Sequence, residues 1–104
     1  MPAIVILTTT PDLKSAQKIA RGLVVKELAA CVSVLPGVTS IYRWKKKVEK
    51  SREALLIIKS PKTRWAAVRK FVLSRHSYEL PELIVLPVVT GSKKYLDWVQ
   101  NLGL

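Results

Sequence analysis

Residue types that carry catalytic or redox chemistry are scarce in this sequence. Cys31 is the only cysteine and His76 is the only histidine, so the chain can form neither an internal disulfide nor a cysteine-rich zinc cluster. Asp12 and Asp97 are the only aspartates, and the four glycines build no phosphate-binding loop. A catalytic triad is hard to assemble from this set, so we predict that the protein is not an enzyme.

Long apolar runs are also missing. The three main runs, at residues 3–7, 54–58 and 83–89, are far shorter than the roughly 18 residues that a membrane-spanning helix needs. No basic stretch precedes the first run, and no credible cleavage site follows it. We therefore expect no membrane span and no signal peptide, and we expect a cytoplasmic protein.

Acidic residues are few compared with basic ones. The chain has 18 Lys and Arg against 7 Asp and Glu, which gives a formal net charge of +11. A charge of this size favours polyanions, anionic membrane surfaces or acidic ligands as partners. A length of 104 residues with 49% apolar content predicts one folded domain over residues 1–104.

The apolar pattern predicts a strand at residues 3–9, followed by a helix that begins at Thr10-Pro11-Asp12, with Thr10 as the cap and Pro11 at the first helical position. Residues 31–44 are rich in β-branched side chains and predict a long strand with a bulge at Pro36-Gly37. Residues 48–59 predict its antiparallel partner, joined to it by a basic turn.

The second half of the chain repeats this alternation. Ser60-Pro61 predicts the start of a second helix, which should end near His76. Residues 83–89 predict a fourth strand with Pro87 at an edge or bulge, and residues 95–102 predict a short last helix. This order predicts an α+β fold: a ferredoxin-like βαββαβ sandwich with an antiparallel sheet plus a short C-terminal helix.

Three of the predicted strands are apolar on both faces. A sheet with one solvated face should alternate apolar and polar residues, whereas residues 3–7, 54–58 and 83–89 are almost continuously apolar. The two main helices cover only one face. Either the terminal helix covers the second face or copies of the chain associate through it, and we predict a stable oligomer.

A basic run lies at the predicted turn of the long hairpin. Tyr42 and Trp44 alternate with cations there, as in proteins that bind single-stranded nucleic acids. RNA-recognition domains, however, present their stacking aromatics in the middle of the first and third strands, where this chain has aliphatic residues. Lys45, Lys46 and Lys47 are thus either solvated turn residues or a contact for a polyanion.

Residues 76–82 form the densest group of metal-binding side-chain types. A neutral imidazole with nearby carboxylate or phenol oxygens suits Cu(II) or Zn(II), so His76 is the candidate metal ligand. One histidine is a weak site unless several subunits contribute to it. The alternative is a histidine that ends the helix and bonds backbone carbonyls.

Short motifs along nearly the whole chain occur in the order typical of one family. The motifs are Ala29-Ala30-Cys31-Val32, Leu35-Pro36-Gly37, Ser40-Ile41-Tyr42-Arg43-Trp44, Glu53, Ile58-Lys59, His76, Tyr78, Pro81-Glu82, Leu86-Pro87 and Tyr95-Leu96-Asp97-Trp98. Together they resemble the divalent-ion tolerance proteins of the CutA family.

The resemblance implies a cytoplasmic homotrimer that takes part in the tolerance of divalent metals, copper above all. It also implies similarity to trimeric PII-type signalling proteins, and therefore a metal or small-ligand site in clefts between subunits. The candidate residues of that cleft are Cys31, Glu53, Lys59, His76, Tyr78 and Glu82.

The chain departs from the family at several positions. Copper ligands proposed in some members include a cysteine at the end of the first strand and a histidine just before the shared one, and this chain has Thr8 and Arg75 there. Ser77 replaces the usual proline. A hydrolase or transferase at the clefts would need Cys31 or Ser77 beside His76, and it is the least favoured alternative.

Overall fold

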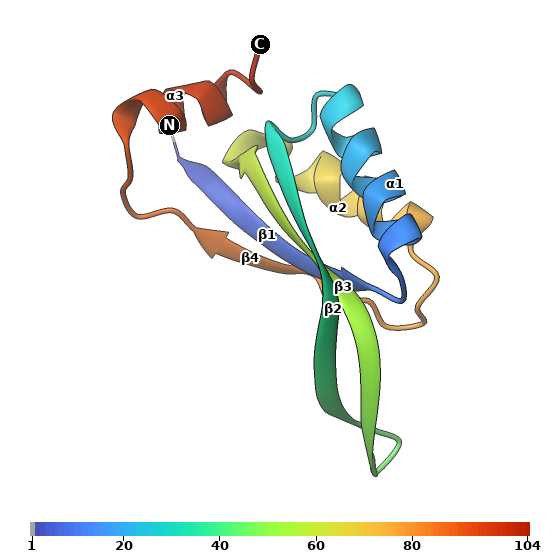
Figure 1. The fold of residues 1–104 in the computed structure, drawn as a ribbon. Helices are drawn as coiled ribbons and strands as arrows, with labels where there is room; N and C mark the ends of the chain where they lie inside the picture. Colours follow the sequence, from blue (N-terminus) through green and yellow to red (C-terminus); the bar gives the residue numbers. More distant parts are fainter. Residues whose placement is uncertain (1) are drawn as a thin grey trace.

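The computed structural model describes residues 2–104 and consists of one four-stranded sheet with helices (Figure 1). The strand order is β2-β3-β1-β4, and every neighbouring pair is antiparallel. This is the predicted ferredoxin-like topology. The elements are β1 (Ala3–Thr10), α1 (Leu13–Val25), β2 (Cys31–Trp44), β3 (Lys47–Pro61), a 3-10 turn (Lys62–Arg64), α2 (Trp65–Arg75), β4 (Ile84–Pro87) and α3 (Lys93–Gln100).

One face of the sheet packs against α1 and α2, which lie on the same side in Figure 1. Because side chains alternate along a strand, Ile6 of β1 and Leu56 and Ile58 of β3 point toward the helices, and none of them is exposed. Leu23 of α1 and Val72 of α2 meet them from the other layer. This cluster is the main hydrophobic core.

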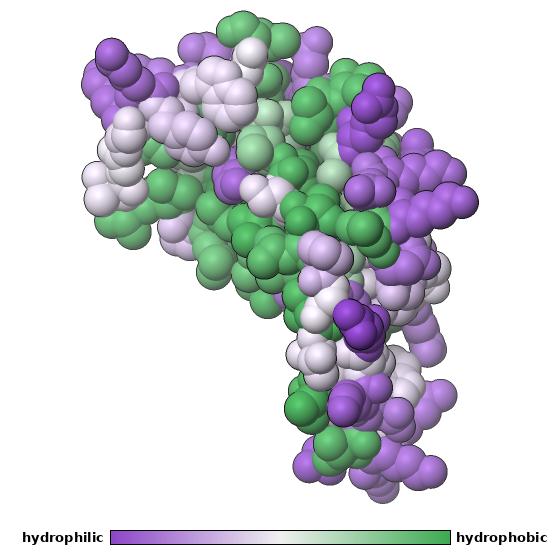
Figure 2. All heavy atoms as spheres, viewed as in Figure 1, coloured by the Kyte–Doolittle hydropathy of each residue, from purple (hydrophilic) through white to green (hydrophobic). Residues whose placement is uncertain are grey.

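The opposite face, which we call the open face, is apolar and largely uncovered. It comprises the alternate residues of each strand, among them Leu35, which is 43% exposed, and Leu86, which is 46% exposed. Figure 2 shows apolar side chains gathered across the middle of the molecule. The terminal helix α3 covers only one end, where Val99 packs against Ala3 and Ala30. The predicted two-faced apolar strands are therefore present in the structure.

The predicted helix starts are two residues too early for α1 and four residues too early for α2. Thr10 ends β1, and Asp12 caps α1 by accepting a hydrogen bond of 2.7 Å from the Ser15 backbone N–H. Ser60 lies inside β3, fully buried, and its hydroxyl donates to the Leu28 carbonyl. The 3-10 turn then precedes α2, which has no side-chain cap. At both helix starts the preceding strand, β1 or β3, includes residues that the sequence pattern assigned to a helix cap.

The predicted bulge and edge positions are confirmed. The register of β2 on β3 shifts between Leu35 and Val38, and Gly37 adopts a positive φ of 71° there. Pro87 lies in β4, which pairs only with β1 and so forms an edge of the sheet. β4 is shorter than predicted. Beyond the bulge, β2 and β3 continue away from the helices as a two-stranded arm, which we define as residues 38–53 (Figure 1).

Two threonines of β1 differ in hydrogen bonding, and this difference predicts opposite effects on stability. Thr8 Oγ1 is buried without a partner among the described residues, whereas Thr10 Oγ1 donates to the Asp12 carbonyl at 2.8 Å. Replacing Thr8 by Val removes an unpaired buried hydroxyl, so we expect the free energy of unfolding to rise by about 1 kcal/mol. Urea denaturation followed by circular dichroism measures this change.

Thr10→Val is the matched control, because both residues lie on the helix face of β1 and are almost fully buried. It removes a satisfied hydrogen bond and should lower the free energy of unfolding by about 1 kcal/mol. Equal effects of the two substitutions would show that the hydroxyl of Thr8 is satisfied in solution.

A pocket at the base of the hairpin arm

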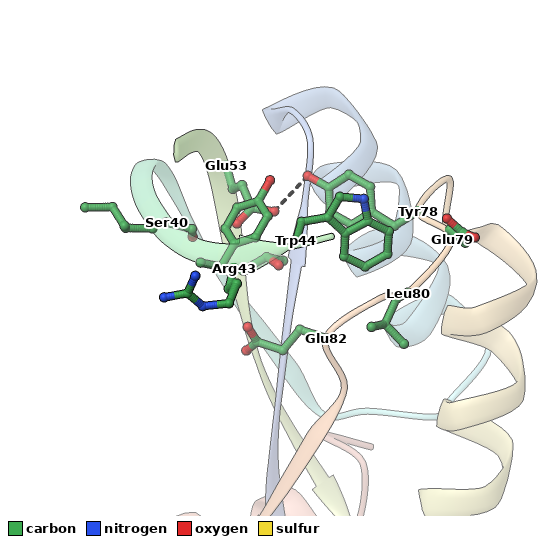
Figure 3. Close-up of a pocket in the computed structure, with 11 residues that line it drawn as sticks. Ser40, Arg43, Trp44, Glu53, Tyr78, Glu79, Leu80 and Glu82 are labelled. Carbon is green, nitrogen blue, oxygen red and sulfur yellow. Dashed lines mark hydrogen bonds between the residues drawn. The ribbon is translucent and has the colours of Figure 1, made fainter. Parts of the chain in front are cut away.

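A pocket lies where the arm leaves the body of the protein (Figure 3). It has a volume of about 590 Å³ and lies between residues 40–44 of β2, the end of β1, and the loop that follows α2. Residues that are far apart in the sequence meet in this pocket, because β1, β2 and β3 are neighbours in the sheet and the loop after α2 crosses beside them. The lining residues are Thr9, Ser40, Ile41, Tyr42, Arg43, Trp44, Glu53, Tyr78, Glu79, Leu80 and Glu82.

Glu53 is the most buried charged residue of the pocket, with 8% of its surface exposed. The Tyr78 hydroxyl donates a hydrogen bond of 2.7 Å to Glu53 Oε2, drawn as a dashed line in Figure 3. Burial, and then the hydrogen bond and charge of Glu53, raise the pKa of Tyr78 above its usual value. The phenol therefore stays protonated and remains a donor to the carboxylate at neutral pH.

His76 connects the loop to the sheet. Its Nε2 lies 2.6 Å from the Thr9 carbonyl oxygen, and its Nδ1 accepts a hydrogen bond of 3.2 Å from the Tyr78 backbone N–H. A carbonyl oxygen can only accept, so Nε2 carries the proton in this arrangement. Both ring nitrogens thus bond to backbone groups, and a metal ion at His76 would have to replace one of these bonds.

The pocket reverses the charge of the molecule locally. Three carboxylates line it, those of Glu53, Glu79 and Glu82, against one basic side chain, Arg43. The whole chain has only 7 acidic residues against 18 basic ones. Nearly half of the acidic residues therefore surround one cavity, which gives this cavity the field that a cation requires.

No group of three or more His, Cys, Asp or Glu residues within residues 2–104 is arranged to hold a metal ion. Thr8 faces the helices rather than the pocket, and the guanidinium of Arg75 lies 4.6 Å from the centre of the Phe71 ring on the helical side. The two positions where some relatives have copper ligands therefore supply none here. A single chain does not form a complete metal centre.

Three predicted ligand residues do not line the pocket. His76 lies next to it, with its ring centre 4.9 Å from that of Tyr78, and Cys31 and Lys59 lie away from it. Lys59 Nζ donates to Ser33 Oγ at 2.8 Å and lies 3.8 Å from Cys31 Sγ, on the open face of the sheet. Lys59 pairs with Cys31 on one side and with Val5 of β1 on the other, whereas His76 contacts Thr9 of β1. At about 3.3 Å per residue this separates the two groups by roughly 13 Å along β1. Cys31 is therefore not beside His76.

Sequence reasoning missed several residues of the pocket. The sequence predicted no role for Thr9, included Glu79 only in the group at residues 76–82, and placed Tyr42, Arg43 and Trp44 in a basic run at the hairpin turn. The hairpin register pairs Tyr42 with Glu49 and Trp44 with Lys47, toward the tip of the arm, so the pocket extends along the arm from Glu53 at its base. Lys45, Lys46 and Lys47 form the exposed tip and do not line the pocket.

Fold and pocket together define an α+β protein of the ferredoxin-like class, with an acidic pocket beside a long hairpin arm. No helix among the described residues is long and apolar enough to cross a membrane. Comparison with known proteins identifies the family. Residues 4–102 match the family model described as CutA1 divalent ion tolerance protein, and the chain belongs to this family.

Individual relatives agree with this assignment. The chain is 41% identical over 100 residues to the divalent-cation tolerance protein CutA of Thermus thermophilus, covering 95% of this chain and 97% of that protein. It is 41% identical over 101 residues to the chloroplastic protein CutA of Arabidopsis thaliana, covering 97% of this chain and 56% of that protein. The chain thus spans little more than half the length of the plant relatives.

Solved structures of the family have the same fold. The structure of CutA1 from Oryza sativa superposes with a TM-score of 0.94 at 38% identity, covering 98% of this chain and 94% of that chain. The divalent cation tolerance protein of Thermus thermophilus superposes with a TM-score of 0.92 at 39% identity, covering 95% and 96% of the two chains. The family is named for tolerance of divalent ions rather than for a reaction.

Proposed function

We propose that this protein is a non-catalytic homotrimer of divalent-metal tolerance that binds a divalent cation, Cu(II) above all, or a small ligand in clefts between its subunits. The observation that carries the proposal is the acidic pocket in a chain of net charge +11. Long-range repulsion opposes the approach of cations to such a chain. A local excess of carboxylates can overcome this repulsion, and the pocket supplies such an excess.

The proposed ligand atoms are the carboxylates of Glu53 and Glu82 in the pocket lining. Tyr78 bonds to Glu53, and His76 lies against Tyr78 just outside the lining. Glu53 bonds to a single donor, the Tyr78 hydroxyl, and so retains lone pairs for a cation. His76 joins the coordination when a metal ion replaces its bond with the Tyr78 backbone N–H. Cys31 and Lys59 would belong to a second part of the cleft on the open face.

The open face supports association between subunits. An apolar sheet face of this kind is rarely left in water, and α3 covers only one end of it. Since a single chain presents no complete set of metal ligands within residues 2–104, the proposed site uses groups from two subunits. The proposed location is the cytoplasm, which cell fractionation tests.

Isothermal titration calorimetry with Cu(II) and with Zn(II) tests the pocket. We expect Glu53→Gln, which keeps an acceptor for Tyr78 but removes the charge, to weaken cation binding at least about tenfold, or by about 1.4 kcal/mol. His76→Ala should weaken Cu(II) binding as well. Native mass spectrometry of the purified protein reports the number of subunits and any retained metal ion.

Glu27→Gln is the matched control, because it removes the same charge from an exposed position at the end of α1, outside the pocket. Its binding curve should coincide with that of the unmodified protein. If the unmodified protein and His76→Ala bind Cu(II) equally weakly, His76 is not a ligand. If Glu53→Gln and Glu27→Gln behave alike, the pocket is not the site.

The alternative function, binding of a polyanion or nucleic acid through Lys45, Lys46 and Lys47, is not favoured by the family. These residues lie at the tip of the arm, where Lys45 and Lys46 adopt positive φ angles. Lys45 Nζ lies 5.9 Å from the centre of the Trp44 ring. A solvated turn accounts for all three lysines.

A further inference from the structure

The two helices that cover the sheet carry basic residues and no acidic ones. Neither α1 nor α2 contains an aspartate or glutamate. All six of their basic side chains are exposed. Within residues 2–104 the only salt bridge is Lys93 with Asp97 on α3, so none of the six has an acidic partner. We call this surface the helical basic face: Lys14, Lys18, Arg21, Arg69, Lys70 and Arg75.

The basic residues of α1 lie close to Arg75 of α2. Lys14, Lys18 and Arg21 follow one another at spacings of four and three, which places them along one side of α1. α2 lies close beside α1, because Phe71 packs directly against Gly22. Arg75 lies over the Phe71 ring and so extends the surface from α1 onto α2.

This arrangement costs stability within the chain. Like charges at a spacing of four, as in Lys14 and Lys18, destabilise a helix by several tenths of a kcal/mol. Lys14 also lies in the first turn of α1, where the helix dipole disfavours a cation. Within residues 2–104 no salt bridge offsets these costs, and the charge of Asp12 at the start of α1 attracts only Lys14. A partner with a high density of negative charge would offset them.

The helical basic face is separate from the other functional surfaces. It lies on the side of the sheet opposite to the open face, and it shares no residue with the acidic pocket. Association through the open face would leave the helices outermost and multiply the basic surface. The inference therefore does not rest on the proposed metal function.

A membrane surface fits this face less well than a nucleic acid does. Helices that bind at a membrane interface insert an apolar face between the lipids. The apolar side of α1, formed by Ala16, Ile19 and Leu23, is already buried against the sheet. The aromatic residues of α2, Trp65 and Phe71, are half-buried. The two helices also expose Leu13, Val24, Val25 and Leu73, but the six cations outnumber these four apolar side chains and suit phosphate groups.

We propose that the helical basic face binds the phosphodiester backbone of nucleic acids. Six Lys and Arg side chains per subunit match a charge-dense backbone, and contacts to phosphate give affinity without sequence preference. Binding should therefore be strong at low salt, weak at high salt and similar for unrelated sequences.

Fluorescence anisotropy with a labelled DNA duplex of mixed sequence tests the proposal over a series of NaCl concentrations. The test variant combines Lys14→Gln, Lys18→Gln and Arg21→Gln, and the matched control combines Lys45→Gln, Lys46→Gln and Lys47→Gln. Both remove three positive charges from exposed positions. We expect the helix variant to bind at least about tenfold more weakly at low salt, with a salt slope lower by about 2 to 3.

The arm variant should change the affinity by less than about threefold under the same conditions. Circular dichroism establishes that both variants fold. The proposal is overturned if the unmodified protein does not bind the duplex, or if both variants lose affinity equally, which would be an effect of net charge alone. A larger loss in the arm variant would place the contact at the hairpin tip. Binding to phosphatidylserine vesicles but not to DNA would identify a membrane surface instead.

Discussion

Replacing Leu35 by Asp should convert the proposed trimer into single chains. Leu35 lies on the open face and is 43% exposed in the isolated chain, so the substitution costs little within one subunit. In an assembly that covers the open face, each copy of the carboxylate would be buried without a partner, at a cost of several kcal/mol per subunit. Size-exclusion chromatography with light scattering should report a trimer for the unmodified protein and a monomer for the variant.

Leu73→Asp is the control for this experiment. Leu73 has a similar exposure of 38% but lies on α2, on the opposite side of the sheet. The same change of side chain there should leave the subunit number unaltered. A monomeric unmodified protein, or a Leu35→Asp variant of unchanged size, would show that the open face is not the surface of association.

Gly22→Leu should destabilise the fold by about 1 to 2 kcal/mol, although helix propensity alone predicts the opposite sign. Leucine is favoured over glycine within a helix by about 0.8 kcal/mol. A Cβ at Gly22, however, would lie 2.5 Å from Cζ of Phe71, and a leucine side chain would extend further into the ring. Overpacking of this kind costs about 1 to 3 kcal/mol or somewhat more. Urea denaturation at a fixed protein concentration measures the difference.

The Phe71→Ala background isolates the cause. Removing the ring opens the space that the leucine needs, so Gly22→Leu should cost much less in this background than in the unmodified protein. The difference between the two costs is the coupling energy of the pair. An increase in stability on Gly22→Leu alone would mean that α1 and α2 separate without penalty.

The sequence predicted the order of the elements because each signal was local. The apolar runs placed the strands, Pro36-Gly37 marked the bulge, and Pro87 marked an edge strand. The cap-like pairs misled because Thr10 and Ser60 satisfy their hydroxyls by other bonds, to the Asp12 and Leu28 carbonyls. A hydroxyl side chain that can cap a helix can also occupy the end of a buried strand, provided that it can donate a hydrogen bond to a nearby carbonyl.

The pocket was only partly predictable, because its contacts join residues distant in sequence. Glu53 and Tyr78 are 25 positions apart, and Thr9 and His76 are 67 positions apart. The family resemblance named Glu53, Tyr78 and Glu82, which the structure brings to one cavity, together with Cys31 and Lys59, which it places elsewhere. Glycine is unfavourable within a helix, and only the close approach of Phe71 explains its presence at position 22.

The arm has a thermodynamic consequence for the pocket. No residue from 39 to 52 is buried, and a two-stranded ribbon of this kind is marginally stable in water by itself. The arm must then be ordered by contacts outside the ribbon. In the proposed assembly, with its clefts between subunits, a neighbouring subunit supplies these contacts. Because residues 40–44 form one wall of the pocket, dissociation of the subunits would loosen this wall while the helices and the core remain folded. Dilution, which dissociates the subunits, would thus abolish ligand binding at protein concentrations at which each chain is still folded.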